Sequence, residues 1–361
     1  MHIAINALSI TNRSGTGRYT WGLIHGFFQI PQPDFKLSII IPADFPIPSA
    51  WQHSTQFRFY SIPVRSTFSR IRWEQFSLPR LLRQIQTDAL HSPAFIAPVV
   101  SDLRIPGVVT IHDLTFERYP SLIPALRRPY YRWAIPKSIR TAQVLLTDSV
   151  TIAEELAQRL TRHPPIIPIH LGVDPVQFSP LPQAQDQRIL HKYGIPSPYF
   201  LTVGTREPRK NLDTILHAFQ LARQQSLKSS LVIAGRLGWM QQADAKFSHT
   251  HFPGFISDED LPALYRHAQA FLAPSIYEGF DLPSVEARAC GTPVIASDIP
   301  VHREVLRDNV HFCKTDNIQD WTDSLLLSEK QPQKPPAPVS IRDWAQVAQE
   351  TLQVYQTLSR K

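Results

Sequence analysis

A chain of 361 residues is longer than a single hydrophobic core usually grows, so its length predicts two domains. With 43% hydrophobic and 19% charged residues the composition excludes a disordered chain, and no apolar run approaches the roughly 20 residues that a membrane-spanning helix needs. The formal net charge of +7 lies entirely in the first 180 residues, which favours an acidic partner such as an anionic membrane surface, a phosphorylated acceptor or nucleic acid.

The cysteines and the N-terminal residues indicate the cellular compartment. Only Cys290 and Cys313 occur, and neither belongs to a metal-like spacing, so we expect two buried, inert thiols in a reducing compartment. The opening MHIAINALSI lacks the basic start of a signal peptide and predicts a first strand. These features favour a cytoplasmic protein.

Residues His2 to Leu8 predict a buried strand, and the loop TNRSGTG from Thr11 to Gly17 is expected to precede a helix over Arg18 to Phe28. A glycine-rich turn between strand and helix lets the backbone approach a phosphate or sugar closely. The loop lacks a Gly-x-Gly-x-x-Gly fingerprint, however, so a simple turn remains the alternative.

Two segments mix arginines with aromatic residues. The first spans residues 64–83 and the second spans residues 118–140, where Tyr130, Tyr131 and Trp133 lie among five arginines and Lys137. Such mixing suits the water–lipid interface, and it also suits single-stranded nucleic acid. A solvated basic helix face is the plain alternative, and among functional interpretations an anionic or lipid-linked acceptor is preferred.

The strand Val108 to Ile111 ends directly at His112. Catalytic groups of α/β proteins lie at the carboxyl ends of strands, and histidine titrates near neutral pH. A structural histidine is the alternative. A further strand, Val144 to Thr147, ends at Asp148, and Ser149 or Thr151 is expected to cap the helix that follows.

The segment 164–170 predicts the last strand of the first half, and the polar, proline-containing residues 175–197 predict a hinge. We therefore expect an N-terminal domain over 1–180, a C-terminal domain over 190–340, and a closing helix over 341–361 that packs back on the N-terminal domain.

The second half begins with the strand Tyr199 to Val203, and the loop GTREPRKN follows it. Three cations, Arg206, Arg209 and Lys210, precede a helix that starts at Leu212. Cations above a helix N-terminus make a diphosphate clamp plausible, with a surface charge cluster as the alternative.

The most informative stretch runs from Ala270 to Pro300. A short apolar strand leads into a loop that carries Glu278, and a helix with Pro283 in its first turn, Glu286 further on and Gly291 at its end follows. Carboxylates accept hydrogen bonds from sugar hydroxyls, and a helix N-terminus favours phosphate, so the stretch suits a nucleotide sugar. Two solvated glutamates are the alternative.

The pattern E-x7-E within PSIYEGFDLPSVEARACGTPVIASDIP closely resembles the signature of the retaining glycosyltransferases of family 4. VTIHDLTF, EPRKN and GVDP are similar to further segments of that family. The resemblance implies an α/β protein of GT-B architecture, with two Rossmann-like doubly wound parallel-sheet domains facing a central cleft. Asp281 departs from the pattern, because many members have glycine there, and Leu171 and Thr205 also depart from it.

The resemblance further implies transfer of a hexose from a nucleotide-diphosphate sugar to a glycan or lipid-linked acceptor, with retention. Because cations and helix dipoles can stabilise the charge of the leaving group, we expect transfer without a metal or other cofactor. His112 and Glu278 are expected to be catalytic. The residues expected to bind the donor lie in the loops at the strand ends, and they are Gly15, Thr16, Gly17, Arg206, Arg209, Lys210, Gly279, Phe280, Asp281, Leu282 and Glu286. Either Arg206 or Arg209 is expected to assist Lys210 at the diphosphate, and Glu286 to hold the ribose hydroxyls.

The run SDIPVHREV is similar to mannosyl- and rhamnosyltransferases of surface polysaccharide synthesis, so GDP-mannose is the first donor to consider. The basic first half suggests a peripheral place on the inner face of a membrane. Two alternatives remain at this point: a nucleotide-sugar epimerase, and a non-enzymatic protein that binds sugar or nucleic acid, although no nucleic-acid partner is expected.

Overall fold

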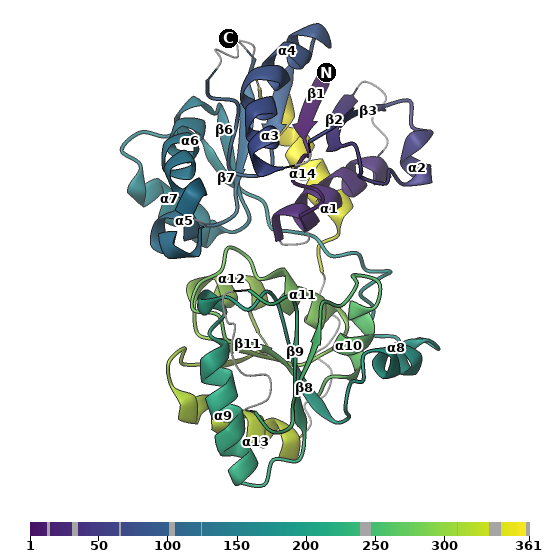
Figure 1. Cartoon of the computed structure of the whole chain (residues 1–361), viewed down its shortest axis with the longest axis vertical. Helices are drawn as coiled ribbons and strands as arrows, with labels where there is room; N and C mark the ends of the chain where they lie inside the picture. The colour runs from purple at the N-terminus through teal and green to yellow at the C-terminus, as the bar shows by residue number, and fades with distance from the viewer. Residues whose placement is uncertain are drawn as a thin grey trace. The chain divides into compact units, whose positions relative to one another are not determined.

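The computed structural model describes residues 1–12, 15–30, 35–64, 66–100, 105–123, 125–238, 247–308, 310–331 and 341–358. The chain divides into two compact units (Figure 1). One consists of Met1–Gly172 together with Arg342–Lys361, and the other of Val173–Ile341. The division falls at residue 172, where the sequence led us to expect it near 180. Arg65 of the first basic segment lies outside the described residues.

The first unit is built on a seven-stranded sheet in which all neighbouring strands are parallel. In spatial order its strands are β3 (Phe57–Ile62), β2 (Lys36–Pro42), β1 (His2–Asn6), β4 (Ala89–Ser92), β5 (Gly107–Ile111), β6 (Val144–Thr147) and β7 (Ile166–Pro168). The chain runs outward from β1 to β3 and then returns to β4 on the other side of β1. The order of the strands therefore reverses between β1 and β4, which is where ligands of such sheets bind.

Helices connect these strands and cover the sheet. They are α1 (Gly15–Gln29), α2 (Ser49–Gln52), α3 (Thr67–Arg72), the π-helix η1 (Trp73–Ser77), α4 (Leu78–Gln84), α5 (Thr115–Arg118), the 3₁₀ turns η2 (Pro120–Leu122) and η3 (Ala125–Arg127), α6 (Arg128–Thr141), α7 (Val150–Arg159) and α14 (Trp344–Gln356). Ser149 caps α7 as predicted, because its hydroxyl accepts a hydrogen bond from the Ile152 amide at 3.3 Å.

The first loop is shorter than the sequence suggested, because α1 begins at Gly15 and not at Arg18. The cause is a close backbone approach. An added Cβ at Gly17 would lie 1.7 Å from the carbonyl oxygen of Asn12, so only glycine allows the helix to start against this loop. Gly15 and Gly17, which the sequence pattern places in a turn, therefore belong to the first turn of α1.

The closing helix α14 packs against α1 within the first unit (Figure 1). A capping box between Asp343 and Gln346 starts it. Trp344 lies directly over Gly22 and Gly26 of α1, where an added Cβ would approach within 2.2 Å and 2.0 Å of this residue. Small residues on α1 thus make room for a large aromatic on α14.

The second unit repeats the design with a six-stranded, all-parallel sheet. Its strands in spatial order are β10 (Thr250–Gly254), β9 (Ser230–Ala234), β8 (Tyr199–Val203), β11 (Phe271–Ala273), β12 (Val294–Ser297) and β13 (His311–Cys313). Its helices are α8 (Asp186–Lys192), the 3₁₀ turn η4 (Pro208–Lys210), α9 (Leu212–Gln224), α10 (Leu261–His267), α11 (Leu282–Ala289), α12 (Pro300–Leu306) and α13 (Ile318–Lys330). Here the strand order reverses between β8 and β11.

The core of the second unit lies between its sheet and the helices α9 and α13, where Phe200, Phe219 and Trp321 are fully buried. Two all-parallel sheets covered by helices confirm the predicted α/β class of two Rossmann-like domains. Among the described helices none is long and apolar enough to cross a membrane. Both cysteines are free and buried, as expected, and burial raises the pKa of each thiol to about 12.

Candidate active site

The loops that follow β8 and β11 meet at the strand reversal of the second sheet. Pro208–Lys210 forms the turn η4, and Asn211 then takes a left-handed conformation with φ 52° before α9 begins. The Ile276 amide of the second loop donates a hydrogen bond to the Arg209 carbonyl at 2.9 Å. This backbone contact places the cations of one loop beside the carboxylates of the other.

Glu278 is the centre of the resulting cluster. Lys210 Nζ lies 2.6 Å from its Oε1 atom, and Arg209 Nη1 lies 2.7 Å from its Oε2 atom. The Ser275 hydroxyl donates a further hydrogen bond to Oε1 at 2.7 Å. Both carboxylate oxygens are therefore bound, and the sequence-predicted residues Arg209, Lys210 and Glu278 are brought together.

Electrostatics keep this carboxylate charged despite its burial, since the Glu278 side chain is only 7% exposed. Burial raises the pKa of Glu278, but the charges of Arg209 and Lys210 outweigh burial and hold the pKa below its ordinary value. At neutral pH the cluster is therefore a salt-bridged anion flanked by two cations.

Asp281 adds a second carboxylate and carries a backbone cost. Its φ is 66°, a left-handed conformation that favours glycine, the residue from which Asp281 departs in the family pattern described above. Its side chain is held by Ser284, which donates to Oδ2, by Lys210 Nζ at 3.7 Å from Oδ1, and by His302 Nε2 at 3.3 Å from Oδ2. Burial raises the pKa of Asp281, but Lys210 and His302 outweigh burial and hold the pKa below its ordinary value, so this group is also ionised.

The remaining donor-site candidates of the second loop lie on or next to α11. Gly279, Phe280 and Leu282 are buried. Glu286 is 1% exposed, and the Tyr265 hydroxyl donates to its Oε2 atom at 3.1 Å. Helix α11 has Pro283 in its first turn and ends before Gly291, which has φ 76°, so the predicted start and end signals are confirmed.

Arg206 and Arg209 take different places. Arg209 joins the Glu278 cluster and also contacts Glu207, with Nε 3.0 Å from Oε2. The Arg206 guanidinium instead lies over the ring of Phe252 on β10, 4.2 Å from its centroid, and the residue is 5% exposed. The geometry therefore groups Arg209, and not Arg206, with Lys210.

In the first unit, His112 follows β5 and pairs with Asp148, which follows the neighbouring strand β6. The His112 Nδ1 atom lies 2.7 Å from Asp148 Oδ2, and Nε2 lies 2.7 Å from the Pro93 carbonyl oxygen. Burial lowers the pKa of His112, but Asp148 and the Pro93 carbonyl outweigh burial and raise it. Because both ring nitrogens face oxygen atoms of other groups, His112 has no free lone pair in this arrangement.

Gly15, Thr16 and Gly17 also belong to the first unit, as the first turn of α1. The Thr16 carbonyl accepts a hydrogen bond from the Thr20 hydroxyl at 2.8 Å, within the helix. One turn further on, Tyr19 packs edge-on against His112, with ring centroids 4.9 Å apart. The start of α1 and His112 are thus connected through one side chain.

One group of possible metal ligands occurs among the described residues. His311, Cys313 and Asp320 bring one ligand atom each within 4.8 Å of one another at β13 and α13. Cysteine binds metals as a thiolate, and the raised pKa of Cys313 disfavours that form.

Sequence reasoning missed two kinds of residue. Asp148 stands at the end of the strand next to β5, so the rule that neighbouring strand ends meet was a signal that could have found it. Ser275 and His302 orient the carboxylates of the second unit, and only the fold brings them there.

Two Rossmann-like domains with polar loops at their strand reversals are the architecture of the GT-B glycosyltransferases. Residues 14–177 match the family model described as Glycosyltransferase Family 4, and residues 186–339 match the model described as Glycosyl transferases group 1. The two models together match most of the chain, which consists of a family 4 segment followed by a group 1 segment, and both models describe glycosyltransferases.

Individual relatives of the chain are also glycosyltransferases. The chain is similar to O-antigen chain mannosyltransferase B of Escherichia coli, with 32% identity over 238 residues, which is 63% of this chain and 61% of the relative. It is also similar to O-antigen chain mannosyltransferase RfbU of Salmonella typhimurium, with 27% identity over 62% of this chain and 61% of the relative. The matches thus span about six tenths of the length of these curated relatives.

Among solved structures, HepE of Anabaena in complex with UDP and glucose has a TM-score of 0.74 and 17% identity, covering 99% of this chain and 100% of that one. This likeness supports the GT-B fold. The family models and the relatives named here are all glycosyltransferases, so the alternatives of an epimerase or a sugar- or nucleic-acid-binding protein are not supported.

Proposed function

We propose that the protein transfers a hexose from a nucleotide-diphosphate sugar to a hydroxyl group of a glycan or lipid-linked acceptor, with retention of configuration. The observation that carries this proposal is the cluster at the β8/β11 reversal, where Lys210 Nζ and Arg209 Nη1 flank Glu278 at 2.6 Å and 2.7 Å. Cations convergent at one strand-end edge suit a diphosphate, and a buried carboxylate suits sugar hydroxyls.

In this proposal the leaving diphosphate replaces part of the present salt bridging. Lys210 and Arg209 turn from Glu278 toward the phosphate oxygens, and their charges stabilise the negative charge that develops as the glycosidic bond breaks. Glu278, released from them, accepts hydrogen bonds from the hydroxyls of the transferred sugar. Two cations and the N-terminus of α11 make a metal ion unnecessary for neutralising the diphosphate, so we propose metal-independent transfer.

His112 is proposed to border the transferred sugar as a hydrogen-bond donor. Both of its ring nitrogens are engaged, and the raised pKa favours the protonated ring, so the geometry supports a donor and not a general base. For the Nε2 hydrogen to reach a sugar hydroxyl, the Pro93 carbonyl must move aside while Asp148 keeps the ring in place. Gly15, Thr16 and Gly17 are proposed as neighbours of the diphosphate or acceptor, and Glu286 as the group that holds ribose.

GDP-mannose is the proposed donor, supported by the O-antigen mannosyltransferase relatives. Thermal melting of the purified protein with GDP, UDP, dTDP and ADP, and with their sugar conjugates, tests this. A ligand at about 100 times its dissociation constant stabilises by roughly 2.7 kcal/mol. We expect GDP and GDP-mannose to raise the melting temperature equally with and without a chelator. If no nucleotide shifts it, the donor site is wrong; if chelation removes the shift, metal independence is wrong.

Peripheral attachment to an anionic membrane is proposed for the first unit, in the cytoplasm. The helices α3, η1, η3 and α6 carry exposed apolar and basic side chains, and these include Phe68, Phe76, Leu126, Trp133, Arg72, Arg127 and Arg132. Arg127 Nη2 donates to Thr67 Oγ1 at 2.8 Å, which ties the two helical segments together.

Co-sedimentation with vesicles tests the attachment. Vesicles with about one third anionic lipid should retain the protein at low salt, neutral vesicles should not, and the double change F68S/L126S should weaken retention severalfold. Changing Leu237 and Val176, two exposed apolar residues of the second unit, to serine is the matched control. Equal binding of both variants, or none by the unchanged protein, would contradict the proposal.

A further inference from the structure

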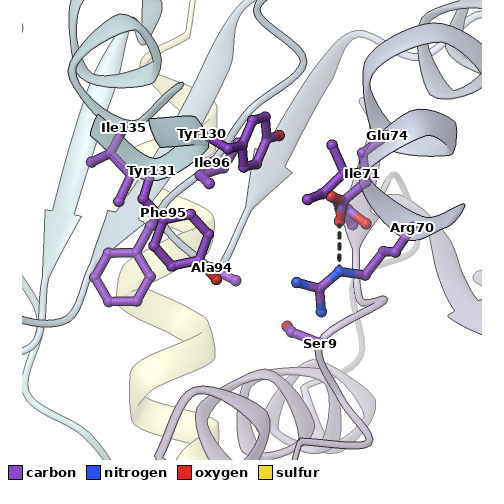
Figure 2. Close-up of a pocket in the computed structure, with 11 residues that line it drawn as sticks. Ser9, Arg70, Ile71, Glu74, Ala94, Phe95, Ile96, Tyr130, Tyr131 and Ile135 are labelled. Carbon is purple, nitrogen blue, oxygen red and sulfur yellow. Dashed lines mark hydrogen bonds and ion pairs between the residues drawn. The ribbon is translucent and has the colours of Figure 1, made fainter. Parts of the chain in front are cut away.

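A pocket lies at the strand reversal of the first sheet, the counterpart of the place where the second sheet carries its charged cluster (Figure 2). Asn6 and Ser9 line it from the end of β1, and Phe95 lines it from the loop after β4. The other walls come from α3 and η1 on one side and from α6 on the other. Ligands of open parallel sheets bind at this position, so the pocket is placed where a ligand is expected.

Polar groups in the pocket have few or no partners among the described residues. Within those residues Glu74 accepts one hydrogen bond, from Asn6 Nδ2 at 3.1 Å, and Arg70 Nε lies 3.8 Å from Glu74 Oε1, beyond hydrogen-bonding distance. Asn6 is 5% exposed, and neither its Oδ1 atom nor the buried Arg70 Nε atom has a hydrogen-bond partner in the part of the chain that the structure describes. Buried polar atoms are nearly always paired, so an unpaired acceptor, an unpaired donor and a sparsely bonded carboxylate indicate a place that a polar ligand completes.

The chemistry of these groups selects hydroxyls. A hydroxyl donates and accepts, so one ring hydroxyl can satisfy Glu74 or Asn6 Oδ1 while another accepts from Arg70. An anionic group would approach Arg70 but meet the Glu74 carboxylate beside it. Burial raises the pKa of Glu74, Arg70 and Asn6 oppose this effect, and hydrogen-bond donors from a ligand would favour the charged form further.

The opposite wall is aromatic. Figure 2 shows Tyr130, Tyr131 and Phe95 facing the side that carries Arg70 and Glu74. Phe95 has φ 63°, which is a strained conformation for a bulky residue, and its amide is tied to the Thr110 carbonyl at 3.1 Å. Strain of this kind gathers at binding sites, and here it holds an aromatic ring against the pocket. A sugar ring has an apolar face and a rim of hydroxyls, which match these two walls.

From these observations we propose that the pocket binds an uncharged hexopyranose ring, the sugar of the acceptor that receives the transferred hexose, with Glu74 and Arg70 as the specificity-determining pair. The inference rests on the proposed function and names the acceptor class that it left open. Phe95 also packs edge-on against His112, with ring centroids 5.3 Å apart, so a ring in the pocket lies one side chain away from the proposed sugar-bordering histidine.

Ligand-observed NMR titrations without any donor test the pocket directly. The probes are the methyl pyranosides of mannose, glucose, galactose and rhamnose, and inorganic phosphate is the anionic comparison. We expect saturable binding of at least one glycoside, at least fivefold weaker in E74Q and R70Q, and unchanged in E117Q, which alters an exposed carboxylate of the same unit. In turnover assays E74Q should raise KM for the acceptor and leave KM for the donor unchanged.

Three results would overturn the proposal: no glycoside binds to the unchanged protein, E74Q and R70Q bind it as well as E117Q does, or phosphate displaces the glycoside. R70Q keeps the test valid if E74Q does not fold, because Arg70 is partly exposed. The melting shift with GDP, measured on the same samples, separates the two hypotheses. A normal shift with no glycoside binding contradicts the pocket alone, whereas glycoside binding without any nucleotide shift contradicts the proposed donor site.

Discussion

The two strand reversals of this protein are alike in backbone and opposite in chemistry. At β8/β11 two cations and two carboxylates lie within ion-pairing distance, and Ser275, Ser284 and His302 satisfy the carboxylates. At β1/β4 one loosely paired carboxylate and one arginine face an aromatic wall, and Asn6 Oδ1 and Arg70 Nε have no hydrogen-bond partner among the described residues. Under the two proposals above, the sheet topology sets the position of each site, and the side chains in the loops select a charged diphosphate at one and a neutral ring at the other.

The largest expected effect comes from removing a cation of the charged reversal. Lys210→Ala should lower kcat/KM by roughly 2–3 kcal/mol, or about 30- to 150-fold, because it removes a charged contact to the diphosphate and leaves Glu278 and Asp281 under-compensated. Steady-state kinetics with GDP-mannose measure this. Lys330→Ala, at the exposed end of α13, should leave kcat/KM unchanged. An equal loss of kcat/KM in both variants would contradict the proposed contact between Lys210 and the diphosphate.

A slightly smaller effect is expected at Asp281. Asparagine tolerates the left-handed backbone, so Asp281→Asn keeps the conformation while it removes the charge that Lys210 and His302 contact. We expect a loss of about 2 kcal/mol in unfolding free energy. Asp281→Gly should lose less, since it relieves roughly 1 kcal/mol of backbone strain. Urea denaturation compares them, and a glycine variant less stable than the asparagine variant would mean that the backbone carries no strain.

In the first turn of α1, two glycines form a matched pair. Gly17→Ala should destabilise the first unit by about 1–3 kcal/mol, because its Cβ would meet the Asn12 carbonyl, whereas Gly15→Ala should cost nothing, because no atom lies within 4 Å of that position. Hydrogen exchange at α1 amides would report the difference. Similar protection in both variants would show that the loop can move aside.

The smallest effects concern pH, and they differ in sign between the units. The pKa of His112 is raised, so its contribution to stability is full below its ordinary value of about 6.5 and is lost as pH rises through the raised value. The pKa of Glu278 is lowered, so its contribution is full above its ordinary value and is lost as pH falls through the lowered value.

Hydrogen exchange across a pH series separates the two units. Protection of β5 and β6 should fall on the alkaline side, and protection of α9 and α11 should fall on the acid side. Asp148→Asn should abolish the alkaline change and leave the acid change intact. An alkaline change that persists in this variant would assign it to another group.

The comparison also shows what the sequence can predict. Lys210 and Glu278 belong to local motifs whose spacing is visible, and His112 ends a strand of four apolar and β-branched residues, so these candidates were found. The pocket was not, because it depends on contacts such as that between Asn6 and Glu74, which are 68 residues apart. Tyr130 and Arg70 lie in two segments whose sequence pattern indicates basic, aromatic helices. No local sequence pattern indicates that the two residues line the same pocket.

Backbone detail was likewise out of reach where packing decides it. The start of α1 at Gly15 depends on the approach of Gly17 to Asn12, and the π-helix η1 interrupts what the sequence presents as one helix over residues 64–83. Periodicity predicts that a helix exists, and tertiary contacts set where it begins and how it winds.

The assignment of α14 to the first unit makes that unit discontinuous, with the second unit inserted as one uninterrupted stretch, Val173–Ile341. Loss of the last residues of the chain would therefore damage the part of the protein that is translated first. Without α14, the groove over Gly22 and Gly26 is open to water, and His91 loses the Tyr355 hydroxyl that lies 2.6 Å from its Nδ1 atom. During synthesis the face of α1 that packs against α14 therefore stays exposed until the second unit has been translated.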